Sequence, residues 1–219
     1  MNQLPILLSE ELIKRAENLT STLLSDAMGC TGSMDYKIKP VVSKARIVGT
    51  ALTVSMRPGD NLFLHQAIHS GSKGYVLIAD GKDHKENAYL GELMAAAAKV
   101  VGLEGIVIDG LVRDKVNLEE LGFPIFAKGF IPNGPLKDGP GLLNSIISCG
   151  GVVVCPGDLI IGDEDGVVVV PKDRISEVLE KAEKKLEYEE KRLKTILEYE
   201  ENKGTSIEPP WLSEKMKAF

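Results

Sequence analysis

The sequence predicts an α/β fold, with a layered body followed by a C-terminal helical extension. Two apolar runs, residues 75–79 and 105–109, flank an alanine-rich segment at 91–101, which is the pattern of a β-α-β unit. Such a unit is expected to be parallel and right-handed. A highly charged segment near the end of the chain carries apolar residues at heptad-like spacing, which is typical of a helix. We therefore expect an α/β body over residues 1–172, and a helix with a tail over 173–219.

Two helices are expected near the start of the chain, over residues 9–28. Ser9 is a residue type that favours the N-cap position, and two glutamates follow it in the opening turn. From Ile47 onward, short apolar runs alternate with glycine and proline, which is the pattern of strands and turns. This pattern predicts a strand at 51–54, a turn at 57–60 and a short helix at 61–70.

The region after residue 109 is expected to add further strands to the same body. The pattern predicts strands at 123–127, 151–154, 159–161 and 167–170, with a Pro/Gly-rich loop over 130–141. The triplet Pro-Gly-Asp occurs twice, at 58–60 and at 156–158, each time after a β run. Pro followed by Gly fits the central positions of a type II turn, so we interpret both triplets as ordinary hairpin turns.

The composition predicts a cytoplasmic protein that does not bind nucleic acid directly or enter a membrane. The chain has 219 residues, 43% of them hydrophobic, and a net charge of −6, whereas phosphate binding needs a basic face. Its three cysteines lack zinc-like spacing and are expected to be reduced thiols in the core. The first residues lack the pattern of a signal peptide, and no apolar stretch reaches the roughly 18 residues of a membrane span.

A candidate active site follows the strand at 105–109. This strand is followed by Asp109-Gly110 and then by the adjacent pair Arg113-Asp114, at the edge where open α/β sheets place ligands. Arginine suits a carboxylate and aspartate suits a hard cation. The helix start Gly91-Glu92-Leu93-Met94 should lie at the same edge and offer free backbone N–H groups to an anion. The alternative is that Arg113 and Asp114 form a surface ion pair worth under about 1 kcal/mol.

The chain resembles the family that contains the regulator of ribonuclease activity A and the divalent-metal-dependent 4-hydroxy-4-methyl-2-oxoglutarate and 4-carboxy-4-hydroxy-2-oxoadipate aldolases. The resemblance extends over residues 20 to 173 and is carried by several spaced motifs, namely those at 58–61, 91–94, 105–114, 123–126, 134–135, 150–158 and 162–171. It implies an α/β/β/α sandwich similar to the swivelling phosphohistidine domain. It also implies assembly as a homotrimer, or as a hexamer built as a dimer of trimers.

The resemblance also implies a site and a reaction. In the aldolases, pyruvate binds to the amides of the segment matching residues 91–94 and to the arginine matching Arg113, while the aspartate matching Asp114 holds Mg²⁺ or Mn²⁺. The implied reaction is cleavage of a 4-hydroxy-2-oxo acid to pyruvate and a second carbonyl compound, with decarboxylation of oxaloacetate as a side activity. Asp109 is a candidate for orienting the water that takes the C4 hydroxyl proton, although an Asp-Gly pair after a strand is also a common turn. Asn117 departs from the family pattern, which usually has an acid there, and this removes one negative charge near the cation.

A glutamate from the C-terminal helix of a neighbouring subunit also approaches the site in these aldolases, and Glu189 is the candidate here. It falls between Leu186 and Leu193 on the apolar stripe of the last segment, where an acid is costly without a partner. The alternative is a solvated or lysine-paired glutamate at the edge of a loose stripe.

Other functions remain open from the sequence. A Schiff-base aldolase would need a desolvated lysine, and only Lys115 is near the pair. His65 and His69 share a helix face at a spacing that can bind metal, and His84 lies in a loop near the expected site. A non-catalytic regulator that acts by protein–protein binding is the alternative from a different class, because the fold alone does not prove catalysis. The C-terminal extension favours the enzyme, since the aldolases are extended in the same way.

Overall fold

The computed structural model describes residues 3–199 and 206–217. The chain divides into two compact units, Met1–Ala182 and Glu183–Phe219. Helix α6 (Ile175–Leu197) belongs to both, because its first turns bury Ile175, Val178, Leu179 and Ala182 in the first unit. The division therefore falls inside this helix, ten residues later than the sequence indicated. The second unit also contains the short helix α7 (Leu212–Met216).

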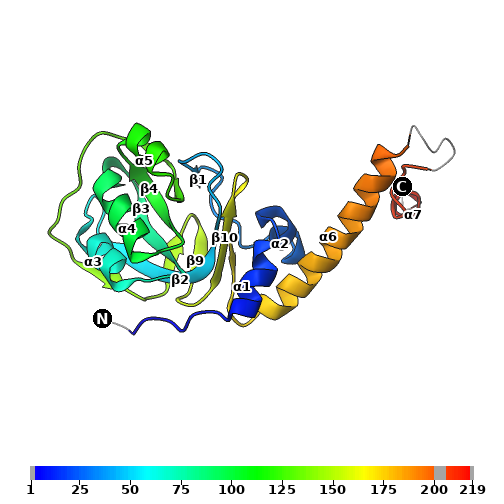
Figure 1. Cartoon of the computed structure of the whole chain (residues 1–219), viewed down its shortest axis with the longest axis horizontal. Coiled ribbons are helices and arrows are strands. Elements are labelled where there is room, and N and C mark those ends of the chain that lie inside the picture. The colour runs from blue at the N-terminus through cyan, green and yellow to red at the C-terminus, as the bar shows by residue number, and fades with distance from the viewer. Residues whose placement is uncertain (1–2, 200–205, 218–219) are drawn as a thin grey trace. The chain divides into compact units, whose positions relative to one another are not determined.

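The first unit is built on a nine-stranded mixed sheet (Figure 1). Its order is β1-β5-β4-β3-β2-β10-β11, with β6 paired to β4 and β7 paired to β2. The strands are β1 (Lys39–Pro40), β2 (Ile47–Met56), β3 (Tyr75–Leu90), β4 (Gly105–Val112), β5 (Ile125–Ala127), β6 (Gly129–Phe130), β7 (Gly141–Leu143), β10 (Leu159–Asp163) and β11 (Gly166–Val170). A separate hairpin pairs β8 (Ile147–Cys149) with β9 (Val152–Val154).

The sheet curves until its two ends lie close together. Strands β1 and β11 stand at opposite ends of the strand order, yet Nζ of Lys39, in β1, donates to the carbonyl oxygen of Asp165, next to β11, at 2.5 Å. The mixed α/β class is thus confirmed. The α/β/β/α layers that the resemblance implies take the form of one nearly closed sheet with helices around it. The likeness to the swivelling phosphohistidine domain stays a prediction.

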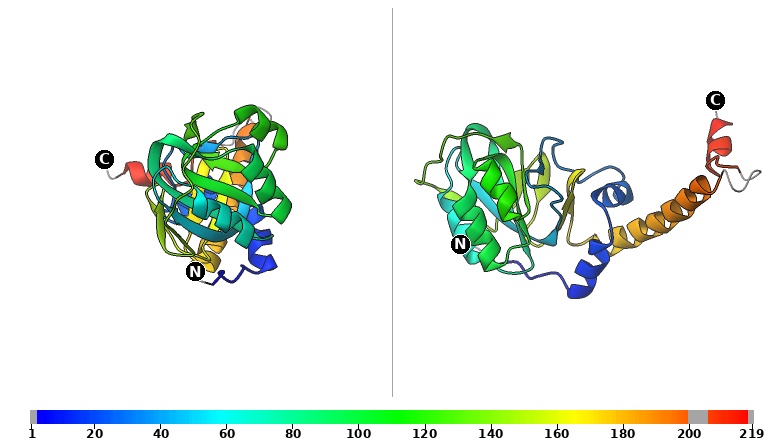
Figure 2. Two further views of the ribbon diagram at one scale, coloured as in Figure 1. Left: turned by 90° about the vertical axis from the view of Figure 1, so that its left-hand side faces the viewer. Right: turned by 45° about the horizontal axis from the view of Figure 1, so that its top comes forward.

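Helices α3 (Leu62–Ser70), α4 (Glu92–Val101) and α5 (Lys115–Leu121) pack side by side on one outer face of the sheet (Figures 1 and 2). Strands β2 and β3, β3 and β4, and β4 and β5 pair in parallel, so the β-α-β unit predicted around α4 is confirmed. The two expected N-terminal helices are present as α1 (Glu10–Glu17) and α2 (Ser21–Ala27). The Ser9 hydroxyl caps α1 by accepting a hydrogen bond from the Leu12 N–H at 3.3 Å.

The ends of two strands were predicted wrongly, and one helix was not predicted. Strand β4 continues through Asp109-Gly110 to Val112, because Gly110 has no side chain and lets the Tyr89 ring pack where a Cβ would come within 2.7 Å of it. Strand β3 likewise extends to Leu90, with register shifts after Ala79. Helix α5 was not anticipated, and it follows directly from the Arg113-Asp114 pair.

The structure also shows how far the cysteines are buried and whether any helix could cross a membrane. Cys149 is buried, as expected, but Cys30 is exposed because it lies in the turn that ends α2, with a positive φ of 61°. Among the described residues, no helix is long and apolar enough to cross a membrane.

Candidate functional site

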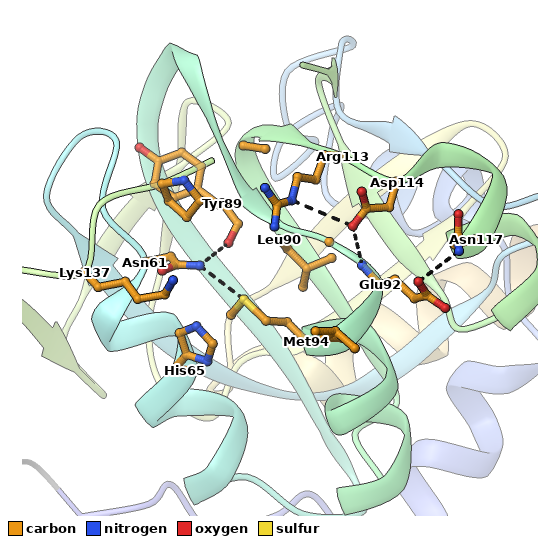
Figure 3. Close-up of a pocket in the computed structure, with 14 residues that line it drawn as sticks. Asn61, His65, Tyr89, Leu90, Glu92, Met94, Arg113, Asp114, Asn117 and Lys137 are labelled. Carbon is orange, nitrogen blue, oxygen red and sulfur yellow. Dashed lines mark hydrogen bonds and ion pairs between the residues drawn. The ribbon is translucent and has the colours of Figure 1, made fainter. Parts of the chain in front are cut away.

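A cavity of about 450 Å³ lies where β3 and β4 end and where α4 and α5 begin (Figure 3). One side is formed by the starts of α4 and α5, and the other by α3 and the loop that precedes β7. The lining residues are Asn61, His65, Ala88, Tyr89, Leu90, Gly91, Glu92, Leu93, Met94, Arg113, Asp114, Asn117, Pro135 and Lys137. The structure therefore brings Arg113, Asp114 and the whole Gly91–Met94 segment to one cavity.

The Arg113-Asp114 pair is held against the start of α4. The Arg113 N–H donates to the carbonyl oxygen of Leu90 at 2.9 Å, which continues the β3–β4 pairing to the end of the sheet. Asp114 then adopts a left-handed conformation with φ 63° and ψ 44°, which is uncommon outside glycine and is often found at functional sites. This conformation aims the Asp114 carboxylate back at α4, where Oδ2 accepts a hydrogen bond from the Glu92 N–H at 3.0 Å. The same oxygen is 3.7 Å from Arg113 Nε.

Gly91 has a different role from the one that its position suggested. A glycine at a helix start can let a ligand approach the backbone closely, but the space beside Gly91 is already filled. A Cβ at this position would lie 2.3 Å from Asp114 Oδ2 and 3.1 Å from Arg113 Nε. Glycine is therefore needed here because the Arg113-Asp114 pair packs directly against the backbone.

The start of α4 retains free donors for an anion. Asp114 occupies the Glu92 N–H, whereas the N–H groups of Leu93 and Met94 have no acceptor within the described residues. The Leu93 side chain is 85% exposed, so its contribution to binding would come from its backbone. Met94 is buried, and its sulfur lies 3.2 Å from Asn61 Nδ2 (Figure 3).

The oxygen atoms around Asp114 suit a cation that keeps much of its water. With Oδ2 bonded to the Glu92 N–H, Oδ1 is the open carboxylate oxygen of Asp114. Asn117 Nδ2 donates to Glu92 Oε2 at 2.9 Å, which leaves the Asn117 carbonyl oxygen available nearby. Within the described part of the chain, no group of three His, Cys, Asp or Glu side chains could hold a metal. Mg²⁺ commonly binds through one or two carboxylates plus waters and substrate oxygens, so these donors fit Mg²⁺ and do not fit a zinc centre.

Asp109 lies away from this cavity, in a buried cluster around Lys128. Asp109 Oδ1 is 2.6 Å from Lys128 Nζ, and Oδ2 accepts a hydrogen bond from the Gly150 N–H at 2.8 Å. Lys128 Nζ also lies 3.1 Å from Asp35 and 2.9 Å from Asp83. Burial opposes the charge of Lys128, but the three carboxylates outweigh burial and raise its pKa above the usual range. The structure thus places Asp109 in a structural ion-pair cluster, and does not bring it to the lining where it was expected to orient a water.

Glu189 lies on α6 in the second unit. Its carboxylate is 3.3 Å from Lys185 Nζ, one turn earlier, and the side chain is 50% exposed. Within the single chain it is therefore the lysine-paired glutamate of the alternative interpretation, and its approach to a neighbouring subunit's site stays a prediction.

The remaining candidates are distributed around the site. His65 lines the cavity, and burial, followed by the charges of Lys137 and His69, lowers its pKa, so it is neutral at pH 7. His84 Nε2 pairs with Asn87 Oδ1 at 2.9 Å and is absent from the lining. Lys115 Nζ lies 5.5 Å from the centre of the Phe130 ring, outside the cavity, so it is poorly placed for a Schiff base.

Two lining residues, Asn61 and Lys137, escaped the sequence-based prediction. Asn61 follows the first Pro-Gly-Asp triplet, whose interpretation as a hairpin turn was wrong because the triplet joins β2 to α3. Lys137 lies in the Pro/Gly-rich loop. Asn61 Nδ2 donates to the carbonyl oxygen of Tyr89 at 2.8 Å, while Asn61 Oδ1 is buried without a partner in the described structure. The match of residues 58–61 to the family motif was the one available signal for this side of the cavity.

Comparison with known proteins identifies the family of this chain. Residues 21–169 match the family model described as "RraA-like: Aldolase/RraA". The chain belongs to the RraA-like family. It is 39% identical over 186 residues to a Halalkalibacterium halodurans protein named "Putative 4-hydroxy-4-methyl-2-oxoglutarate aldolase", which covers 85% of this chain and 89% of that protein. A Bacillus cereus protein with the same name is 35% identical over 129 residues, covering 59% of this chain and 80% of that protein.

Two solved structures share the fold. The RNA-processing inhibitor RraA from Thermus is 30% identical, with a TM-score of 0.64 over 69% of this chain and 92% of that one. An uncharacterized protein from Pseudomonas syringae is 25% identical, with a TM-score of 0.78 over 94% of this chain and 98% of that one. The RraA-like family thus includes proteins named as aldolases and a protein named as an RNA-processing inhibitor, so membership alone does not decide between catalysis and regulation.

Proposed function

We propose that this RraA-like protein is a carbon–carbon lyase that cleaves a 4-hydroxy-2-oxo acid to pyruvate and a second carbonyl compound, and that also decarboxylates oxaloacetate. The observation that carries the proposal is the cavity in which the Arg113 guanidinium, the Asp114 carboxylate and the free amides of α4 meet. The names of the relatives in Halalkalibacterium halodurans and Bacillus cereus support the same reaction class.

The chain's own groups account for binding of the 2-oxo acid end. The free N–H groups of Leu93 and Met94, at the positive end of the α4 dipole, favour the substrate carboxylate. Arg113 provides a guanidinium that donates to the oxygen on C2 or to the carboxylate. Gly91 keeps Arg113 and Asp114 packed together, so both side chains are held in place before substrate arrives.

A divalent cation, Mg²⁺ or Mn²⁺, is the proposed cofactor. Asp114 Oδ1 would hold it, and the Glu92 carboxylate and the Asn117 carbonyl oxygen, in the lining of the same cavity, would bind its waters. When bound, the cation supplies Lewis acidity toward the oxygens of the 2-oxo acid. Asn117 carries no charge, and we expect the affinity for the cation to be lower than an acidic residue at this position would give.

The reaction requires charge stabilisation at one end of the substrate and proton removal at the other. When the C3–C4 bond breaks, its electron pair moves toward the C2 carbonyl, and negative charge grows on the C2 oxygen. Arg113 stabilises that charge through hydrogen bonds that strengthen as the charge develops. The C4 hydroxyl loses its proton as C4 becomes a carbonyl carbon, and C3 later takes up a proton to yield pyruvate. In oxaloacetate the same bond breaks, with carbon dioxide as the leaving product.

A homotrimer or hexamer is the proposed assembly, with Glu189 of a neighbouring subunit contributing to the site. Support comes from the second unit, where Leu193, Ile196 and Leu197 of α6 are 56%, 45% and 73% exposed. Leucine and isoleucine side chains in such a row favour burial against another surface. Light scattering with size-exclusion chromatography tests the assembly, and a monomer at micromolar concentration would refute it.

The test of the function is pyruvate release, coupled to lactate dehydrogenase, from oxaloacetate and from 4-hydroxy-2-oxo acids with Mg²⁺ or Mn²⁺. We expect EDTA to abolish the activity, added cation to restore it, and borohydride to trap no covalent adduct on Lys115. Arg113→Ala should lose most activity, whereas Lys37→Ala, which removes an exposed cation outside the cavity lining, should lose none. Absence of cation-dependent activity on every 2-oxo acid would overturn the proposal.

The regulator remains the competing function, supported by the solved structure named as an RNA-processing inhibitor. A regulator would act through a protein surface and would not depend on the cavity. If the wild-type protein is inactive on all 2-oxo acids yet inhibits ribonuclease E equally well with and without the Arg113→Ala change, regulation is the better explanation.

A further inference from the structure

Two polar side chains, His84 and Asn87, lie outside the cavity lining and hold the backbone that packs against Arg113. Asn87 Nδ2 donates a hydrogen bond to the carbonyl oxygen of Gly134 at 2.6 Å, and Asn87 Oδ1 pairs with His84 Nε2 at 2.9 Å. Gly134 in turn lies directly beside the guanidinium, because a Cβ at Gly134 would come within 3.1 Å of Arg113 Nη1. The two side chains therefore reach Arg113 through one short stretch of backbone.

Hydrogen-bond chemistry fixes the orientation of both side chains. The Gly134 carbonyl oxygen can only accept, so the NH2 end of the Asn87 amide must face it. The amide oxygen of Asn87 then faces His84, and because this oxygen can only accept, His84 Nε2 must carry a proton and donate it. One of the two neutral tautomers of histidine satisfies this requirement, so the bond does not need a charged imidazole.

The His84–Asn87 pair is packed against the turn that precedes α3. A Cβ at Gly59 would lie 2.9 Å from Asn87 Oδ1 and 3.0 Å from His84 Nε2, so both atoms rest directly on that backbone. The Gly59 N–H donates to the hydroxyl of Tyr89, a fully buried residue, at 3.0 Å. The Tyr89 ring also meets the His84 ring edge-on, with 6.3 Å between the ring centres. Asn87 is thus braced on the side away from Gly134.

Other bonds hold the same loop independently of the Asn87 side chain. The Ala88 N–H donates to the carbonyl oxygen of Asn133 at 2.8 Å, and Asn133 Nδ2 donates to the carbonyl oxygen of Glu86 at 3.0 Å. Removing the Asn87 amide should therefore leave the loop attached to β3. We expect only the backbone at Gly134 to lose its support.

We propose that Asn87, oriented by His84, is a positioning residue that sets the Arg113 guanidinium through Gly134. The inference rests on the proposed function, because it assigns the support of the side chain that binds the 2-oxo acid end. Asp114 Oδ2 lies 3.7 Å from Nε of Arg113, whereas the contact with Gly134 is made at Nη1. A planar, forked donor binds a carboxylate or an enolate well only when its plane is turned correctly, and the Gly134 wall sets that plane.

The first experiment measures binding without turnover, by isothermal titration of oxalate in the presence of Mg²⁺. Oxalate has a carboxylate next to a second anionic oxygen, as does the enolate that forms when the C3–C4 bond breaks. Asn87→Ala should weaken oxalate binding by about 3- to 10-fold, the usual effect of losing one hydrogen bond. Asn87→Asp should weaken it at least as much, because it keeps the size of the side chain but replaces the donor with a second acceptor facing Gly134.

The variants of His84 test whether this residue acts through Asn87. His84→Leu removes the donor and should weaken oxalate binding in the same direction, whereas His84→Gln keeps an N–H donor and should restore most of the loss. Combining His84→Leu with Asn87→Ala should be no worse than Asn87→Ala alone, since both changes remove one chain of contacts. The matched control is Glu86→Gln, because this side chain is exposed and only its backbone bonds to the loop.

The second experiment tests the connection to Arg113 itself. Lysine at position 113 has no Nη1 beside Gly134, so Asn87→Ala should change oxalate affinity by less than about twofold in an Arg113→Lys background. With Arg113 present, Asn87→Ala should lower kcat for oxaloacetate more than it raises KM, because the bonds from Arg113 strengthen as charge develops on the C2 oxygen. A purely structural effect would instead weaken both backgrounds equally.

The outcomes separate the role of Asn87 from the proposed reaction. Wild-type oxalate affinity in Asn87→Ala, or equal weakening with arginine and with lysine at position 113, would overturn the positioning role. Failure of the wild-type protein to bind oxalate would overturn it too. Oxalate binding that depends on Asn87 only when Arg113 is present, in a protein that turns over no 2-oxo acid, would support Asn87 and refute the proposed lyase.

Discussion

Replacing Gly91 with alanine is the most direct test of how the site is built. The change adds one methyl group and removes no charged side chain. The new Cβ would lie 2.3 Å from Asp114 Oδ2 and 3.1 Å from Arg113 Cγ. Ordinary contacts between such atoms are at roughly 3.5 Å or more, so the Asp114 carboxylate must move by about 1 Å.

That displacement should affect activity far more than stability. Moving the carboxylate breaks its hydrogen bond with the Glu92 N–H, and hydrogen bonds to charged groups are worth about 1.5–3 kcal/mol. The Asp114 side chain is 40% exposed, so water replaces part of the interaction and we expect a loss of only about 1 kcal/mol in the free energy of unfolding. Misplacing a catalytic group by about 1 Å can cost about 100-fold in rate, and that is the expected loss in kcat/KM.

The assay combines urea unfolding with coupled pyruvate release from oxaloacetate. Val100→Ala is the control on the same helix, since this side chain is 86% exposed at the far end of α4. Gly134→Ala gives a graded comparison, because its Cβ would meet only the flexible Arg113 Nη1, at 3.1 Å. We expect the activities to fall in the order Val100→Ala, Gly134→Ala, Gly91→Ala. Near-wild-type activity in Gly91→Ala, with Asp114 still bonded to α4 in its crystal structure, would refute the reasoning.

Three further predictions concern other residues. Arg113→Lys keeps the charge but loses the forked donor geometry, so kcat/KM for oxaloacetate should fall by about 10-fold or more; equal rates would show that charge alone suffices. Lys128→Met leaves Asp109, with a side chain 10% exposed, without its ion pair, and urea unfolding should show a loss of about 3–5 kcal/mol; a loss below about 1 kcal/mol would mean that water replaces the lysine. Burial raises the pKa of Asp60, but the backbone donors outweigh it and hold the pKa below 3.8, so the stabilising effect is present above pH 3.8 and is lost as the pH falls through the folded-state pKa. Asp60→Asn should therefore lower the urea midpoint at pH 7 and lower it less at pH 3, and an equal difference at both pH values would contradict the assignment.

The parts that sequence reasoning predicted correctly depend on local patterns. The strand–helix–strand unit around α4 follows from the spacing of apolar residues, and parallel pairing then brings Gly91 and Arg113 to the same edge of the sheet. The N-cap at Ser9 is equally local, because a hydroxyl needs only the N–H three residues later. The resemblance to the RraA-like family was likewise carried by short ordered motifs and is confirmed by the family match.

The parts that sequence reasoning missed depend on contacts between distant segments. Asp109-Gly110 looks like a turn, and only the Tyr89 ring packed over Gly110 and the ion pair of Asp109 with Lys128 explain why it is part of a strand. Lys128 is 19 residues from Asp109 in the chain, and no periodicity links the two. A pattern of neighbours cannot reveal a partner that the fold brings from a distant segment of the chain.

The two Pro-Gly-Asp triplets show how such a long-range contact shapes the cavity. Both aspartates are buried: Asp60 is 2% and Asp158 is 3% exposed. Asp158 accepts hydrogen bonds from the N–H groups of Cys155 and Lys172, yet burial still raises its pKa. Asp60 accepts three, two of them from the loop that carries Lys137, and its pKa is lowered. The first triplet therefore does more than form a turn. The Asp60 carboxylate also fixes the loop that forms the wall of the cavity opposite Arg113 and Asp114.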